Sequence, residues 1–190
     1  MIEVVDADAA RTALTAGVLP CPCGGRLAPW GRARERTVAG LADNRLTVRP
    51  DRARCRSCGV THVLLPADLL LGCAYRVQVV GAVLLRASLG QGRRAIAGQV
   101  AVPASTVARW TRRFAANAEA LRGHLTRRIV ALDQELVPTL AHRGASADAL
   151  EALGALAVAA ARRYRLGRVD PWRLLALETG GRLLSSRPAY

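Results

Sequence analysis

The sequence predicts a mainly α-helical protein that carries a small β-sheet region near its N-terminus. Residues 20–66 hold four of the five cysteines, and Gly and Pro separate the short extended runs between them. Residues 67–190 instead place apolar residues at helical spacing, with interruptions at Pro and Gly. The length of 190 residues suits one medium domain or two small ones.

The N-terminal third of the chain changes character at Pro20. Residues 1–19 are expected to contain one short helix, capped by Asp6 or Asp8 and ended by Gly17. Residues 20–66 are expected to form the β region, with a turn at Asp43-Asn44. The extended runs in it predict strands over residues 34–41, 45–49, 52–54 and 60–65.

Residues 67–131 are predicted to form a helical domain. An apolar stripe predicts a first helix over residues 75–89, ended by the turn Gly90-Gln91-Gly92. Two further helices follow and are separated at Val102-Pro103.

Residues 132–190 are predicted to form a C-terminal helical region, with a break around Pro138. Ser146 is expected to be the N-cap of a helix over residues 147–166. Asp170-Pro171 predicts the start of a last helix, because Pro is favoured at the first helical position. The apolar residues of this region predict either packing on the preceding helices or a dimer interface.

The two cysteine pairs predict a metal site. Cys55 and Cys58 form a C-x-x-C-G turn, and Cys21 and Cys23 form a shorter C-x-C-G turn before it. Two such turns separated by a β-hairpin are typical of a zinc ribbon, so the four thiolates are expected to hold one Zn²⁺ tetrahedrally. With all four positions filled by protein, this zinc would be structural and would leave no open position for catalysis.

Other ligand sets and other roles for the cysteines stay open. The short C-x-C spacing changes the angle between Cys21 and Cys23, so His62, or the more distant Cys73, is a substitute ligand. Thiols without metal are the plain alternative. A redox role is disfavoured, because no βαβ pattern surrounds either pair.

The charge distribution predicts an anionic partner. The chain carries 28 basic residues, all of them Arg, against 14 acidic residues, for a net charge of +14. Residues 76–130 alone carry ten Arg and one acid, Glu119. Because a solvated face usually mixes both signs, this surplus favours nucleic acid as the partner.

A helix-turn-helix core is predicted over residues 93–113. Two helices that cross over a shared small core need apolar residues at fixed offsets and a small residue at their contact. Ala97 is that small residue, and Ala101 lies in the turn. The apolar offsets are filled by Ile96, Val100, Val102, Val107 and Trp110. Trp110 is interpreted as a core residue rather than one that stacks on a base.

The second helix of this pair is predicted to read double-stranded DNA. Ser105 and Thr106 can reach phosphates or base edges, and Arg109 can reach guanine O6 and N7 in the major groove. Four other arginines are expected to bind phosphates, giving affinity with little sequence information. These are Arg93, Arg94, Arg112 and Arg113.

A cysteine ribbon followed directly by a helix-turn-helix resembles the DNA-binding front half of bacterial insertion-sequence transposases. The resemblance is carried by Cys21, Cys23-Gly24, the basic segment from Arg52 to Gly59, and the helix-turn-helix from Arg93. It covers residues 20–115, and short zinc-ribbon/helix-turn-helix proteins of high-GC bacteria are similar over the same stretch. The resemblance implies a regulator or a protein derived from a mobile element.

Catalysis is not predicted. In such transposases a domain with three catalytic carboxylates follows, whereas residues 132–190 are Ala-, Leu- and Arg-rich. Asp133 and Glu135 occupy alternate positions that do not converge on one metal pair, and His124 and His142 have no candidate nucleophile beside them. A nucleic-acid enzyme would need a convergent acidic or histidine cluster, so the chain is expected not to be an enzyme.

The remaining expectations concern location and a competing function. The longest apolar run is too short for a bilayer, and the first ten residues hold acids where a signal peptide has basic residues. A cytoplasmic location is therefore expected, with no membrane partner. The competing function is a protein-interaction module of the transcription or transposition machinery, in which the ribbon docks a partner.

Overall fold

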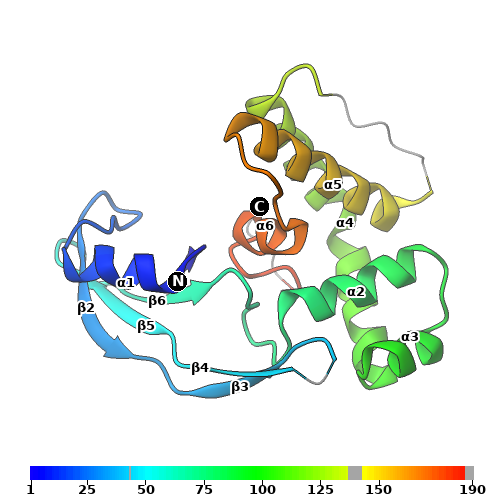
Figure 1. Ribbon diagram of the computed structural model, residues 1–190, viewed down its shortest axis with the longest axis horizontal. Coiled ribbons are helices and arrows are strands. Elements are labelled where there is room, and N and C mark those ends of the chain that lie inside the picture. The colour runs from blue at the N-terminus through cyan, green and yellow to red at the C-terminus, as the bar shows by residue number, and fades with distance from the viewer. Residues whose placement is uncertain (43, 137–142, 187–190) are drawn as a thin grey trace.

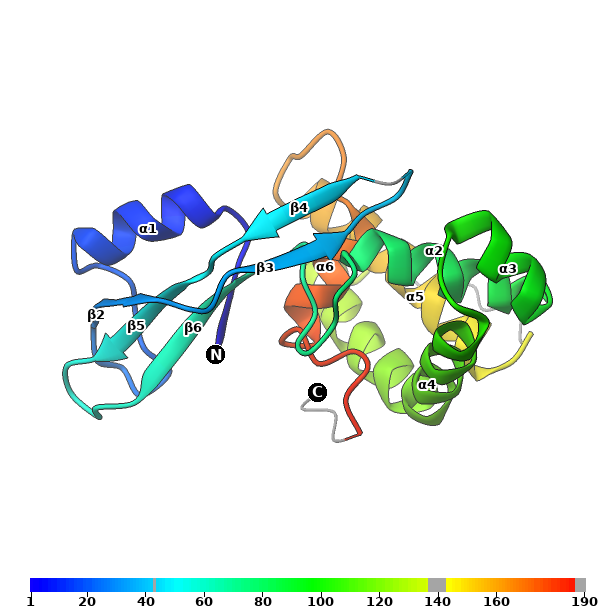
Figure 2. The same cartoon turned by 90° about the horizontal axis from the view of Figure 1, so that it is seen from below.

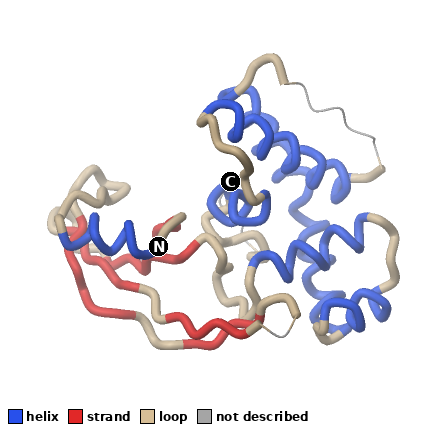
Figure 3. Tube along the Cα trace, viewed as in Figure 1, coloured by secondary structure: helices blue, strands red, loops and turns tan. Residues whose placement is uncertain are grey.

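The computed structural model describes residues 1–186 except 43 and 137–142, and these residues form a mixed α/β structure. The strands and the first helix gather at one end, and the other helices gather at the other end (Figures 1 and 3). The elements are β1 Ile2–Val4, α1 Ala7–Thr15, β2 Leu27–Arg32, β3 Arg36–Ala39, β4 Arg45–Val48, β5 Asp51–Cys55, β6 Thr61–Pro66, α2 Val77–Ser88, α3 Arg93–Val100, α4 Ala104–Leu132, α5 Ala145–Arg163 and α6 Pro171–Glu178.

A four-stranded sheet forms the N-terminal end, in the order β1-β6-β5-β2. The strand β1 runs parallel to β6, whereas β5 pairs antiparallel with both β6 and β2. Side chains alternate across the strands, and Leu27, Ala53 and Leu64 meet the helix α1 on one face. The apolar face of α1, with Ala10 and Leu14, closes this small cluster.

The hairpin β3–β4 leaves this sheet and reaches the helices (Figure 2). Its inner side buries Val38 against Leu65 and Leu69. At its far end, the amide of Ala39 donates to the carbonyl of Ala74 at 2.9 Å, and the amide of Arg76 donates to the carbonyl of Ala39 at 2.8 Å. These bonds join the hairpin to the segment that leads into α2.

The helices α2–α6 surround the larger hydrophobic cluster. The 29-residue α4 buries one side chain about every third or fourth position, as a helix with one apolar face does. The helix α5 packs along α4, and its Leu153, Leu156 and Ala159 are fully buried in the same cluster. The C-terminal helices therefore pack on the helices before them, one of the two arrangements that the sequence left open.

Several predicted elements are confirmed. Strands lie within or across the four predicted runs, and the Asp6 side chain caps α1. The Asp170 carboxylate likewise accepts from the amides of Trp172 and Arg173 at the start of α6. The predicted turn at Asp43 and the break at Pro138 fall on residues outside the described part of the chain.

Other expectations are wrong. Ser146 is not an N-cap, because α5 already begins at Ala145 with Gly144 as the capping position. The same helix ends at Arg163 rather than residue 166, since Arg165 adopts a left-handed backbone with φ of 53°. The fold class is confirmed in part: a small N-terminal sheet precedes the helices, but β1 and β2 add two unpredicted strands, and the fold is mixed α/β.

Among the residues that the structure describes, no helix combines the length and the apolar composition that a bilayer span requires.

Candidate metal centre and nucleic-acid interface

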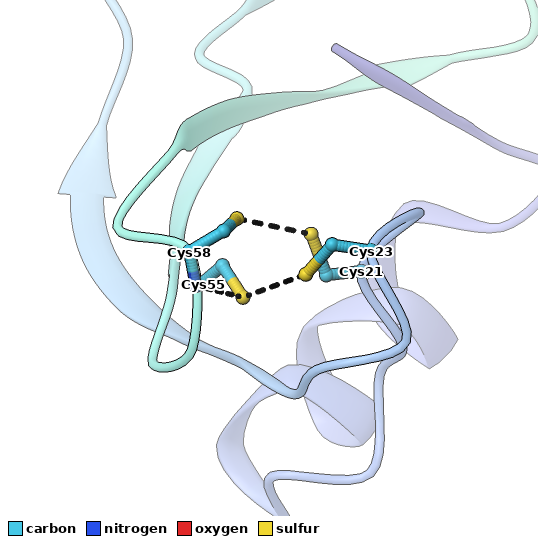
Figure 4. A group of neighbouring side chains, drawn as sticks. All are labelled: Cys21, Cys23, Cys55 and Cys58. Atoms are coloured by element: carbon cyan, nitrogen blue, oxygen red, sulfur yellow. Dashed lines mark hydrogen bonds between the residues drawn. The ribbon is translucent and has the colours of Figure 1, made fainter.

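Two tight turns at one end of the sheet bring four cysteines together (Figure 4). The first turn precedes β2, and the amide of Cys21 donates to the carbonyl of Gly25 at 2.8 Å. The second joins β5 to β6, and the amide of Cys55 donates to the carbonyl of Val60 at 2.9 Å. Because β2 and β5 are paired with Leu27 opposite Cys55, the two turns face each other.

Gly25 sets how closely the two turns approach. A Cβ atom at this position would lie 2.5 Å from Ser57 Oγ and 2.9 Å from Cys55 Sγ. Any larger residue would therefore push the first turn away from the second. The second glycine after the C-x-C pair, Gly25, is therefore required by this contact.

The separations of the four sulfur atoms are compatible with those around one bound metal ion. Cys21 Sγ lies 3.9 Å from Cys58 Sγ, and Cys23 Sγ lies 3.5 Å from Cys55 Sγ. All four sulfurs lie within 4.8 Å of one another. Four thiolates around one zinc ion at about 2.3 Å would be about 3.8 Å apart, so the cluster is compatible with a bound metal. The short C-x-C pair brings both of its thiols into this group.

Backbone amides, burial and the neighbouring thiols shift the pKa values of Cys55 and Cys21 in opposite directions. The amide of Cys58 donates to Cys55 Sγ, and with the amide of Ser57 it lowers the pKa of Cys55 to about 6 against the effect of burial. The amide of Cys23 alone would lower the pKa of Cys21, but burial and the three neighbouring thiols raise it to about 12. One thiolate is therefore already favoured at neutral pH, and a cation is needed to stabilise the others.

The two proposed substitute ligands lie outside this group of four. His62 is buried and places Nε2 3.5 Å from Cys21 Sγ, beside the cluster rather than in it. Cys73 is packed in the helical core with Val77 and Val80. The structure thus assembles the four predicted cysteines, and His62 contacts one of them.

The helices α3 and α4 meet at a short turn over residues 101–103. Ala101 adopts a left-handed backbone with φ of 54° and ends α3. All five predicted apolar positions are buried, from Val107 at 0% exposed to Val100 at 8%. Trp110 is 2% exposed and meets Tyr75 edge to face at 5.2 Å, which confirms that it is a core residue.

The predicted DNA-contacting residues lie at three places on this helix pair. Ser105, Arg109 and Arg112 are exposed on α4, whereas Thr106 is half-buried. Arg93 and Arg94 are exposed in the first turn of α3. Arg113 is exposed, but its side chain is anchored, because its Nη1 donates to the carbonyl of Leu184 at 3.3 Å.

Features that the sequence did not point to lie around the same helices. The tip of β3–β4 and the turn between α3 and α4 line one cavity of about 210 Å³, which includes Arg45 and Gln99. Arg182, from the segment after α6, lines another cavity together with Arg109 and Arg113. Each cavity is lined by residues that lie far apart in the chain, so no local sequence pattern could have indicated either cavity.

On the cysteine-bearing sheet, one large aromatic residue is half-exposed. Trp30 in β2 is 51% exposed, and the Arg54 guanidinium lies 4.8 Å from the centre of its ring. Trp30 precedes Gly31, whose φ is 84°, at a break in the pairing of β2 with β5. This irregularity explains why the strand was not predicted.

No protein-family model, curated protein or solved structure matches this chain.

Proposed function

We propose that the chain is a double-stranded DNA-binding protein in which α3 and α4 form a helix-turn-helix. The observation that carries the proposal is the face of α4 opposite Val107 and Trp110, which presents Ser105, Arg109 and Arg112 to solvent. A helix with this placement enters the major groove with its N-terminal residues toward the bases. Arg109 would then donate hydrogen bonds to guanine, and Ser105 would hydrogen-bond to a neighbouring base or phosphate.

The start of α3 is suited to the phosphate backbone. Arg93 and Arg94 occupy its first turn, and within the described part of the chain no side chain caps its N-terminus. The positive end of the helix dipole and two exposed guanidinium groups therefore favour an anion at this end of α3. This arrangement fixes the register of the protein on DNA without reading sequence.

The metal proposed for the cysteine cluster is Zn²⁺ in a structural role. Four thiolates are the ligand set of structural zinc, and their separations fit tetrahedral coordination. Bound zinc would neutralise the thiolates of Cys21, Cys23, Cys55 and Cys58 and join the two turns. The sheet would then form a zinc ribbon that holds the β3–β4 hairpin in place beside α2.

The biological role follows from which DNA is bound. A regulator binds sites near the genes it controls, whereas a protein derived from a mobile element binds that element's ends. Both readings use the same helix pair and the same residues. A location in the cytoplasm and a non-enzymatic role are parts of this proposal.

The experiment is a DNA titration of zinc-loaded protein with matched arginine variants. Arg112→Ala should weaken binding to every duplex and lower the salt dependence by about one phosphate contact. Arg109→Ala should remove the preference between sequences, at a cost of about 1–3 kcal/mol at the preferred site. Arg127→Ala, an exposed arginine in the second half of α4, is the control and should bind as the parent does.

A second candidate function is a protein-docking role for the ribbon, and Trp30 favours it. A half-exposed indole stacked on Arg54 is the kind of residue that dominates protein interfaces. The Trp30→Ala variant separates the two candidates. Unchanged DNA affinity excludes Trp30 from the DNA interface and leaves it for a protein partner, whereas a loss comparable to that of Arg112→Ala assigns it to DNA.

A further inference from the structure

A cavity of about 390 Å³ opens beside α4, on the flank that carries Arg109 and Arg113. Its other walls are the segment 71–75, before α2, and the segment 182–186, after α6. Three parts of the chain that are far apart in sequence therefore build it.

The lining is strongly basic. Arg109, Arg113 and Arg182 contribute three guanidinium groups, and Ser185 and Ser186 line the same space. Among the described residues, neither Asp nor Glu is part of the lining. Three cations that line one cavity without an acid repel one another, so an anion in the cavity would relieve that repulsion.

The walls are fixed by specific contacts. Arg113 Nη1 donates to the carbonyl of Leu184 at 3.3 Å, and Asn117 Nδ2 donates to the carbonyl of Ser185 at 3.2 Å. The amide of Leu71 donates to the carbonyl of Gly181 at 2.8 Å. These bonds hold the C-terminal segment against both α4 and the segment before α2, so the three arginines are gathered by the fold.

The apolar side of the cavity is formed by the buried Trp110 and Cys73 and the half-buried Tyr75. Trp110 packs edge to face on Tyr75, and Cys73 lies beside them. Burial raises the pKa of the Cys73 thiol, and the positive charges of Arg109 and Arg36 oppose this shift. Arg109 lines the same cavity as these apolar residues.

We propose that this cavity is a phosphate-binding site in which Arg113 and Arg182 donate to the phosphate and Arg109 adds positive charge to the lining. Guanidinium groups donate paired hydrogen bonds to phosphate oxygens, which suits this lining better than it suits a neutral ligand. The phosphate has two sources, a DNA backbone phosphate next to α4 or a small phosphorylated molecule. Only the first source rests on the proposed DNA-binding function.

The site is tested first without DNA. Inorganic phosphate is titrated into the zinc-loaded full chain at constant ionic strength, with heat and amide chemical shifts as readouts. The parent should bind saturably, with shifts in segments 71–75 and 182–186. Arg182→Ala should weaken binding at least tenfold and Arg182→Lys less, whereas Arg127→Ala should not change it. Thermal melting of each variant shows that the exposed substitutions leave the fold intact.

The source is tested by measuring the salt dependence of DNA binding for Arg182→Ala. A fall in affinity, with the dependence on salt lowered by about one contact, assigns the site to a backbone phosphate. Phosphate binding with unchanged DNA affinity, or with no DNA binding at all, assigns it to a small phosphorylated molecule. Absence of saturable phosphate binding by the parent, or equal binding by Arg182→Ala, overturns the proposal.

Discussion

His62 Nε2 lies 3.5 Å from Cys21 Sγ, and the Nδ1 of the same ring lies 3.3 Å from the N-terminal amine of Met1. Burial and the charge of that amine lower the pKa of His62, so the ring is neutral at pH 7. A neutral ring can donate one N–H to the thiolate of Cys21. His62 therefore supports a ligand of the proposed metal from just outside the four sulfurs.

The His62→Ala variant should retain zinc less tightly, by about 10–100-fold, because Cys21 loses this neighbour. Competition with a coloured chelator measures the change. His62→Gln is the control, since its amide can still donate to Cys21 and should recover part of the affinity. Equal zinc affinity in all three proteins would contradict a role for His62 at the metal.

Zinc binding should release protons at neutral pH. The pKa of Cys21 is raised to about 12 by burial and its thiol neighbours, and the thiols of Cys23 and Cys55 raise the pKa of Cys58 against the Val60 amide. Both thiols are protonated at pH 7 without metal, so zinc must displace at least two protons and bind more tightly as pH rises. An indicator dye in weak buffer measures the release. An affinity that does not change between about pH 6 and pH 8 would contradict this prediction.

Removal of the proposed zinc should unfold the sheet with α1 and leave the helices α2–α6 folded. The sheet cluster contains Cys21 and Cys55 themselves, whereas the α2–α6 cluster is built from separate residues. Addition of a chelator should therefore remove hydrogen-exchange protection from β2, β5 and β6 while helical circular dichroism persists. Loss of the helical signal in the same transition would show that the two clusters do not fold independently.

The Gly81→Ala variant should be destabilised by about 1–3 kcal/mol, because its Cβ would overlap a buried contact between α2 and α6. A Cβ at this position would lie 2.2 Å from Cδ2 of Trp172. Urea unfolding measures the change. Gly154→Ala in α5 is the matched control, since no atom lies within 4 Å of its Cβ. That variant should be slightly more stable than the parent, and equal stability of both variants would contradict the packing described here.

Local patterns predicted much of the metal cluster and the helix pair. The cysteine turns have short-range spacing, and the buried positions from Ile96 to Trp110 follow helical periodicity. Asp6 and Asp170 could be identified as caps because capping depends on the adjacent two or three residues.

Long-range contacts could not be predicted in this way. The three-residue β1 exists because it pairs with β6, which lies about 60 residues later in the sequence. Arg182 reaches the flank of α4 only because segment 182–186 packs there, and no spacing rule links it to Arg109. The N-cap expected at Ser146 was wrong because Gly144, two residues earlier, already occupies the capping position.

The decisive measurement is a selection from randomised duplex DNA with zinc-loaded protein at about physiological salt, where nonspecific phosphate binding is weakened. The parent should enrich one motif, which the double variant Ser105→Ala and Arg109→Ala should lose while both proteins keep the same thermal stability. An inverted repeat would add that two copies bind together. Retention of DNA without any enriched motif would contradict sequence reading by α4, and no retention at all would contradict DNA binding itself.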